Sequence, residues 1–284
     1  MISSKESKRA TSRPSATDRK GGEERPRKKW SRDDTKGLTA ALAIMLSWAA
    51  SLGLLLTAPL TSIFWYWAIP ALLLQTFLYT GLFITAHDAM HGTITPSRPM
   101  LNNALGNTAV FLYALFNFKK LTTKHWEHHL HPGDPEQDPD FNNGIEDRFD
   151  KWYVRFMMNY LSLPQLIGMG IVFNTLVYLA DVPVLNLVLF WVAPALLSTV
   201  QLFLFGTYLP HKTPRSGHTN PHHSISNDFP VWLSFLTCYH FGYHLEHHEH
   251  PRVPWWRLPA VRFKKVDPGP AFVLPEDPTT PSMS

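Results

Sequence analysis

The sequence of 284 residues contains a single cysteine, Cys238, and this scarcity excludes two classes of protein. One thiol cannot form a disulfide within the chain, which excludes a secreted disulfide scaffold. No second cysteine stands at metal-ligand spacing, which excludes a cysteine-based zinc module. The start of the sequence also lacks the apolar core and small-residue cleavage site of a signal peptide. We therefore expect no secretory signal, and we expect Cys238 to be a packing residue.

Charge is missing from four long apolar stretches, at residues 38–57, 61–86, 161–180 and 182–209. None of them contains Lys or Arg. Each has the length of about 20 residues that a helix needs to cross a hydrocarbon layer of roughly 30 Å. The sequence therefore predicts an all-α integral membrane protein with four transmembrane helices.

The links between these stretches and the positions of the basic residues predict the topology. Very short links, at residues 58–60 and at Asp181, indicate that the four helices form two hairpins. All 26 Lys and Arg residues lie before residue 37, from Arg98 to Arg155, or after residue 211. Because basic loops stay in the cytoplasm, both termini and the central segment are predicted to face it. The segments on the cytoplasmic side would form a helical cap over the transmembrane helices.

The segments outside the predicted spans differ from them in charge and in apolar content. Residues 1–36 carry twelve basic and six acidic residues but few large apolar ones, so we expect a disordered basic tail. The rest of the chain is slightly acidic, so the high pI indicates contact with anionic lipid and not with nucleic acid. The predicted parts are this tail, a membrane domain at 37–260 and a C-terminal tail at 261–284. Four asparagines in residues 100–118 favour an interfacial or half-buried helix there.

All fifteen histidines lie between His87 and His250, and eight of them form three clusters. On a helix, spacings of three and four residues return side chains to nearly one face, so each cluster can converge on a metal ion. One four-coordinate zinc would use only half of the eight, whereas two ions would use all of them. An even number of predicted crossings separates the clusters, which brings them to one membrane face. The clusters are His87 and His91; His125, His128 and His129; and His244, His247 and His248.

Other polar residues are candidates for supporting roles. His211 follows the fourth predicted span and is either a ninth ligand or a hydrogen-bond partner of one, and for His240 the second role is favoured. The carboxylates Asp88, Asp138 and Asp140 are expected to accept hydrogen bonds from ligating histidines. The remaining histidines lie in polar or Pro-rich stretches where exposed loop positions are expected: His131, His218, His222, His223 and His250.

The amino-acid sequences around the three clusters resemble the motifs of a known superfamily. The stretches are His-Asp-Ala-Met-His-Gly-Thr-Ile, Lys-His-Trp-Glu-His-His-Leu-His-Pro-Gly with Asp-Pro-Asp-Phe, and Cys-Tyr-His-Phe-Gly-Tyr-His-Leu-Glu-His-His. On this topology they resemble the membrane fatty-acid desaturases and hydroxylases, over residues 38–259, and within them the bacterial and cyanobacterial β-carotene ketolases. Three residues separate His87 from His91, as in the ketolases, where many acyl desaturases have four.

The resemblance implies an activity and its cofactors. Two non-haem irons, held by the eight clustered histidines with His211 in the place of a further ligand, would activate O2. The reaction would introduce keto groups at C4 and C4′ of β-ionone rings, giving echinenone and then canthaxanthin from β-carotene, and astaxanthin where zeaxanthin is accepted. The substrate would come from the bilayer. No flavin, nicotinamide or iron-sulfur motif is visible, so electrons would come from a ferredoxin-type donor. Substrate-binding residues are not identifiable.

Three alternatives remain at this stage. An acyl desaturase or hydroxylase, or a carotenoid hydroxylase, would use the same diiron site with a different pocket. A zinc-dependent membrane hydrolase would need about one zinc and no O2. A metal carrier would place ionisable ligands at membrane depth, and the predicted spans have none beyond their ends.

Overall fold

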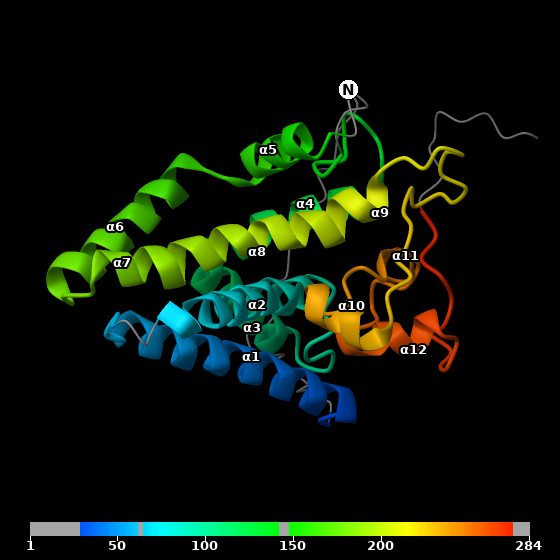
Figure 1. The fold of residues 1–284 in the computed structure, drawn as a ribbon. Coiled ribbons are helices and arrows are strands. Elements are labelled where there is room, and N and C mark those ends of the chain that lie inside the picture. The colour runs from blue at the N-terminus through cyan, green and yellow to red at the C-terminus, as the bar shows by residue number, and fades with distance from the viewer. Residues whose placement is uncertain (1–28, 62–64, 142–147, 275–284) are drawn as a thin grey trace, which may run out of the picture.

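The computed structural model describes residues 29–61, 65–141 and 148–274, and the regular structure in these ranges is helical, as the sequence predicts (Figure 1). The first half contains α1 (Arg32–Thr57), α2 (Trp65–Met90), α3 (Pro99–Ala114), α4 (Phe118–Leu130) and α5 (Phe149–Tyr160). The second half contains α6 (Leu163–Leu179), α7 (Val184–Leu187), η1 (Val188–Val192), α8 (Ala193–Phe203), η2 (Leu204–Tyr208), α9 (Leu209–His211), α10 (Val231–Cys238), α11 (His244–Glu249), η3 (Trp255–Arg257) and α12 (Leu258–Arg262).

Within the described residues, three helices are long and apolar enough to cross a membrane: α1, α2 and the continuous run from α7 to α9. They correspond to three of the four predicted spans. The remaining one, at 161–180, forms the apolar helix α6, which has 17 residues and follows α5 through a bend of 86°; α5 and α6 together are a fourth candidate span. At 1.5 Å per residue α6 is about 26 Å long. Leu161 and Ser162 are extended and Pro164 lies in the first turn of α6, which explains the break.

The ends of the described chain bear on the predicted tails. Helix α1 begins at Arg32, where the Ser31 hydroxyl accepts from the Asp34 N–H and the Asp34 carboxylate accepts from the Ser31 N–H. The last five residues of the predicted tail 1–36 are therefore helical. The predictions for residues 1–28 and 275–284 lie outside the described residues.

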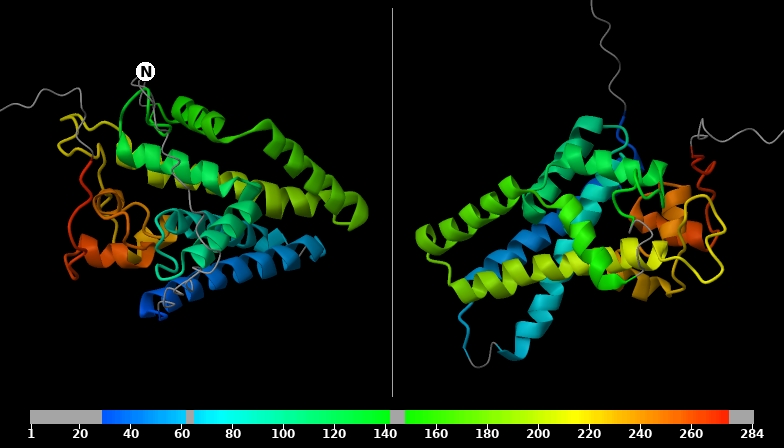
Figure 2. Two further views of the ribbon diagram at one scale, coloured as in Figure 1. Left: turned by 180° about the vertical axis from the view of Figure 1, so that it is seen from behind. Right: turned by 90° about the horizontal axis from the view of Figure 1, so that it is seen from above.

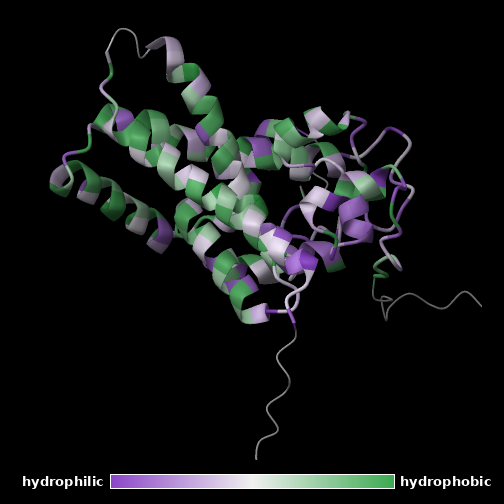
Figure 3. Ribbon diagram, turned by 90° about the horizontal axis from the view of Figure 1, so that it is seen from below, coloured by the Kyte–Doolittle hydropathy of each residue, from purple (hydrophilic) through white to green (hydrophobic). Residues whose placement is uncertain are grey.

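Helix α2 is the centre of the packing. Helices α1, α3 and α8 lie against it, and its Tyr79, Leu82 and Ile84 are fully buried (Figures 1 and 2). Helix α3 buries one face against α2, as expected for a half-buried helix over residues 100–118. Polar residues gather at the end of the molecule that carries α11 and α12, whereas the long helices are mainly apolar (Figure 3).

Helix α6 packs much more loosely. Among its residues only Gln165 is buried, and the Gln165 amide donates to the Ala114 carbonyl at 2.6 Å. Asp181, with φ of +50°, turns the chain from α6 into α7. From this turn α6 and the run α7 to α9 diverge, so α6 stands away from the rest of the bundle (Figures 1 and 2).

Two π-helical segments interrupt the run from α7 to α9. In η1 the Ala193 N–H donates to the Val188 carbonyl, and in η2 the Leu209 N–H donates to the Leu204 carbonyl. A proline, Pro194 or Pro210, follows each segment closely. Because proline has no N–H and its ring clashes with the carbonyl four residues earlier, the backbone widens to five-residue hydrogen bonding there. This widened run ends at His211.

Candidate metal centre

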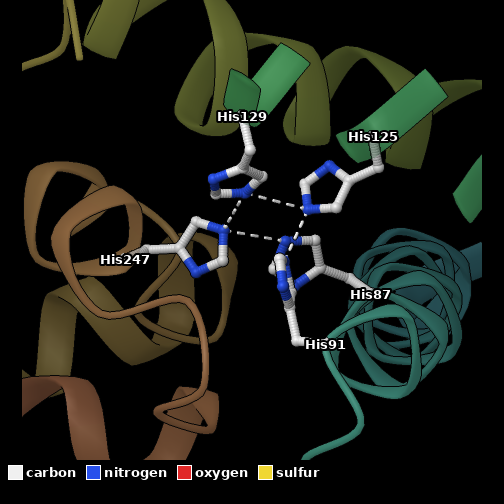
Figure 4. Close-up of side chains that lie close together, drawn as sticks. All are labelled: His87, His91, His125, His129 and His247. Carbon is white, nitrogen blue, oxygen red and sulfur yellow. Dashed lines mark hydrogen bonds between the residues drawn. The ribbon is translucent and has the colours of Figure 1, made fainter. Parts of the chain in front are cut away.

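Five histidines from three distant helices form one group, shown in Figure 4. Their ligand nitrogens all lie within 4.8 Å of one another, and every ring except that of His125 is buried. His87 lies in α2, and His91 is the residue directly after that helix. His125 and His129 lie in α4, and His247 lies in α11. The close-up shows the ring nitrogens pointing toward a common centre.

Four more histidines form a second group under the same distance limit, and all four are buried. His128 comes from α4, His211 from the end of α9, and His244 and His248 from α11. Helices α4 and α11 therefore supply both groups. The three predicted clusters and His211 come together, divided five and four.

Hydrogen bonding alone cannot satisfy the first group. Its Nε2 atoms form a chain of contacts: His91 to His125 at 2.7 Å, His125 to His129 at 3.1 Å, His129 to His247 at 3.0 Å, and His247 to His87 at 3.2 Å. A ring nitrogen carries either one proton or one lone pair, so it makes one such bond. The three inner nitrogens of the chain each have two partners. A cation that accepts all the lone pairs removes this conflict.

The second group has the same conflict. Its Nε2 atoms connect His128 to His248 at 3.2 Å, His248 to His244 at 3.1 Å, and His244 to His211 at 3.0 Å. The two inner nitrogens again have two partners each. The donor set consists of imidazoles, which suit iron, zinc, copper and nickel. Both groups thus fit a metal ion.

The electrostatics of the rings favour metal binding. Burial lowers the pKa of His125, His129 and His247 well below its usual value, and neighbouring imidazoles lower it further. The same causes lower the pKa of His244 and His248. The neutral imidazole is the form that binds a metal.

His128 is the exception among these rings. Burial lowers the pKa of His128, but the charge of Asp138 and a hydrogen bond from Nδ1 to its Oδ1, at 2.9 Å, outweigh burial and raise the pKa to about 9. Backbone N–H groups of Gly133 and Asp140 also donate to the Asp138 carboxylate. The turn after α4 thereby fixes the acceptor that orients His128.

The other two predicted carboxylates have different surroundings. Asp140 lies 4.0 Å from His128 Nδ1 and accepts a hydrogen bond from the Tyr160 hydroxyl. Asp88 lies 3.7 Å from His87 Nδ1 and accepts from the Trp255 backbone N–H at 3.2 Å. Both are close to a grouped histidine. Tyr160, which the sequence analysis did not identify, has no motif that would have indicated its role.

The remaining histidines lie outside both groups. His240 has a left-handed backbone in the turn between α10 and α11, and its ring stacks on Tyr243. Its buried Nδ1 has no hydrogen-bond partner within the described ranges, and a supporting role for His240 stays a prediction. His222 was expected to be exposed but is only 4% exposed, with its ring centroid 5.8 Å from that of His248. The expectation for His222 was wrong because the loop folds over α11.

An apolar cavity adjoins both groups. Its wall includes His87 and His125 of the first group and His128 and His244 of the second. Aromatic and aliphatic side chains line the rest, among them Phe83, Tyr113, Phe116, Met157 and Phe241. Sequence reasoning missed these residues, although Phe241 lies within the third histidine motif. The cavity can hold an apolar molecule with one end against the histidines.

Comparisons with known proteins agree with this site. The chain matches the fatty acid desaturase family over residues 64–180 and 165–272. It is 41% identical over 243 residues to a zeaxanthin 4-ketolase of Chlamydomonas reinhardtii, covering 81% of this chain and 54% of that protein. It is 47% identical over 191 residues to a β-carotene 4-ketolase of Protosiphon botryoides, covering 66% and 49%.

A bacterial relative is covered more fully. A β-carotene ketolase of a Paracoccus species is 42% identical over 190 residues, which are 66% of this chain and 76% of that protein. The chain spans about half the length of the two algal relatives. The motifs resemble those of ketolases, and the matched residues include both histidine groups. This chain belongs to the fatty acid desaturase family, with β-carotene and zeaxanthin ketolases among its relatives.

Proposed function

We propose that this protein is a membrane-bound carotenoid 4-ketolase that uses two non-haem irons. One observation carries the proposal: nine imidazoles form two groups, and two rings of each group line one apolar cavity. The relatives named as β-carotene and zeaxanthin ketolases support the carotenoid as substrate. Zeaxanthin differs from β-carotene by a hydroxyl on each ring, so either ring type is a candidate.

The histidine groups would hold one iron each. His87, His91, His125, His129 and His247 would surround the first, and His128, His211, His244 and His248 the second. The irons would supply the activation of O2. Asp138 would fix the tautomer of His128 so that its Nε2 lone pair faces the second ion. Asp88 and Asp140 would act as supporting acceptors nearby.

The reaction needs two hydroxylations at one carbon. Each round consumes one O2, two electrons and two protons, inserts one oxygen into a C4–H bond, and releases one water. The resulting geminal diol loses water to leave the ketone. The apolar wall of the cavity would orient the ring and exclude bulk water, with Phe83 and Phe241 beside the histidines.

The membrane arrangement is part of the proposal. The helices would form two transmembrane hairpins, α1 with α2 and α6 with α7 to α9, within a catalytic domain at residues 37–260. The basic residues outside the spans favour cytoplasmic termini, with the histidine groups under a cytoplasmic helical cap in a bacterial inner membrane. Electrons would come from a ferredoxin-type donor on that side.

Expression in a β-carotene-producing bacterium, followed by chromatography of the pigments, tests the function. Echinenone and canthaxanthin should form with oxygen and should be absent without it. A strain that makes zeaxanthin tests the hydroxylated ring. The absence of ketocarotenoids in both aerobic strains, with protein present in the membrane, would refute the proposal.

Metal analysis of the purified protein separates the zinc hydrolase from the diiron alternatives. A ketolase, an acyl desaturase and a carotenoid hydroxylase all require about two irons per chain, whereas a hydrolase requires about one zinc. A sphingolipid desaturase of Drosophila melanogaster is 29% identical over 204 residues, so acyl lipid extracts should be checked for new double bonds.

A further inference from the structure

A second apolar cavity adjoins the one at the histidines. It lies between α6 and the run α7 to α9. Four residues, Tyr113, Phe116, Met157 and Thr199, line both cavities. These shared walls make the two cavities neighbours without an intervening helix.

The outer end of the second cavity is exposed. Its lining residues Leu166 of α6 and Leu196 of α8 are 52% and 55% exposed. Gly170 of α6 also lines it, and a Cβ placed there would meet nothing within 4 Å. Figure 2 shows that α6 and α8 diverge on this side. The two neighbouring cavities, called the passage below, together extend from the histidines to the side of the bundle.

We propose that the carotenoid enters sideways from the bilayer between α6 and α8. This inference rests on the proposed function. One ring would occupy the cavity at the histidines, the conjugated chain would lie in the second cavity, and the far ring would stay in lipid. The walls that the two apolar cavities share and the exposed apolar residues at the outer end favour a long hydrocarbon over a ligand delivered from water.

This arrangement determines how the two rings react. The cavity at the histidines is the only part of the passage that adjoins them in the described structure, so one ring reacts while the other is held outside. The product with one keto ring must leave and return in the opposite direction. Echinenone therefore appears free in the membrane before canthaxanthin forms.

The test uses Gly170→Phe, which places a ring in the passage without touching the histidine groups. Its matched control is Gly53→Phe in α1, where an added Cβ also meets nothing within 4 Å and which lines neither cavity. Each purified protein, loaded with iron and supplied with donor and O2, receives β-carotene in lipid vesicles or β-ionone. β-Ionone carries the same ring on a short chain and does not need the passage to hold a polyene.

We expect Gly170→Phe to lower β-carotene oxidation at least about tenfold, equivalent to about 1.4 kcal/mol. Turnover of β-ionone and the thermal unfolding temperature should match those of the control. Retention of β-carotene by metal-free protein during purification from vesicles should fall in the same variant, which measures the passage without chemistry.

The outcomes separate the two proposals. If wild-type protein oxidises neither substrate, the proposed function fails. If wild-type protein oxidises both and Gly170→Phe leaves β-carotene turnover and retention unchanged, or reduces both substrates equally, lateral access is refuted. Canthaxanthin formed without free echinenone, when excess unlabelled echinenone is added to labelled β-carotene, would also overturn the reaction of one ring at a time.

Discussion

The two histidine groups share helices α4 and α11 but are held in different ways. In the second group, acceptors fix three of the four Nδ1 atoms: Asp138 for His128, the His223 carbonyl for His211 at 2.9 Å, and the Phe241 carbonyl for His244 at 3.3 Å. The Nδ1 of His248 is buried without a hydrogen-bond partner in the described part of the chain. The three hydrogen bonds set the tautomer and the angle of the rings that make them. The second group is therefore oriented mainly by polar contacts.

The first group depends more on packing. The buried Nδ1 atoms of His91 and His129 have no hydrogen-bond partner in the described part of the chain. The indole of Trp126 instead packs against both rings, with centroids 5.1 Å and 5.7 Å away, and donates to the Met90 carbonyl at 3.2 Å. The comparison teaches that one iron site would be sensitive to loss of an acceptor and the other to loss of packing.

Removal of a ligand should have the largest effect, and the effect should be equally large in the two histidine groups. Loss of a residue that hydrogen-bonds a metal ligand lowers activity about 10–100-fold. We expect His247→Ala and His244→Ala, which each remove a ligand itself, to lower ketolase activity by more than this. Iron per chain should fall in both variants. His131→Ala, outside both groups, is the control. Full iron content and activity in either ligand variant would contradict the assignment of that group.

Loss of the acceptor should distinguish the groups. Asp138→Asn keeps the shape of the side chain but removes the charge that pairs with His128. Activity and affinity for the second iron should fall about 10–100-fold, while the first iron is retained. Iron titration followed by spectroscopy measures the two affinities. Asp134→Asn, which touches no histidine of either group in the described ranges, should behave as wild type.

Competition between protons and iron for His128 should also distinguish the two histidine groups. Since the metal-free His128 has a pKa raised to about 9, it is protonated at neutral pH and must lose its proton to bind iron. Affinity for the second iron should therefore rise about tenfold per pH unit up to about pH 9 and then level off. The lowered pKa values in the first group predict no such rise above neutral pH. Metal titrations at several pH values check this, and equal slopes would contradict it.

The smallest effect is expected from a change in packing. Trp126→Phe retains an aromatic ring beside His91 and His129 but loses the hydrogen bond to Met90, worth about 1 kcal/mol. The first iron should be lost at a lower temperature, while the second should be retained as in wild type. Iron release during a thermal ramp measures this. Earlier loss of the second iron would show that packing does not distinguish the groups.

Much of the site could be predicted from the sequence because helical spacing is local. His87 and His91, or His125 and His129, lie one turn apart and must share a face. Their division into two groups could not be predicted. His128 is rotated by about 100° from His129 around α4 and therefore joins a different group. Which partner it meets depends on how α11 and α9 pack, and that contact is between residues far apart in the chain.

The fold was predictable to a similar extent. Apolar length indicated α1, α2 and the run α7 to α9, because crossing a membrane imposes a minimum length on each helix. Composition changes from partly charged in α5 to apolar in α6 and so also indicated where α6 begins, but it did not indicate the bend of 86° between the two helices. The exposure of His222 was predicted wrongly because the burial of a loop residue depends on the distant segments that the loop packs against.

The π-helical segment η2 holds one residue more than an α-helix would need, between Leu204 and Tyr208, and His211 ends the short helix that follows. Five residues in the wide turn cover about the rotation that four cover in an α-helix, so the helix keeps its direction beyond η2. Deleting one residue from η2 would therefore restore ordinary helical winding and leave His211 in the second group. Adding a further residue, with no wide turn to absorb it, would rotate everything beyond it by about 100° and turn His211 out of the group although every imidazole remained.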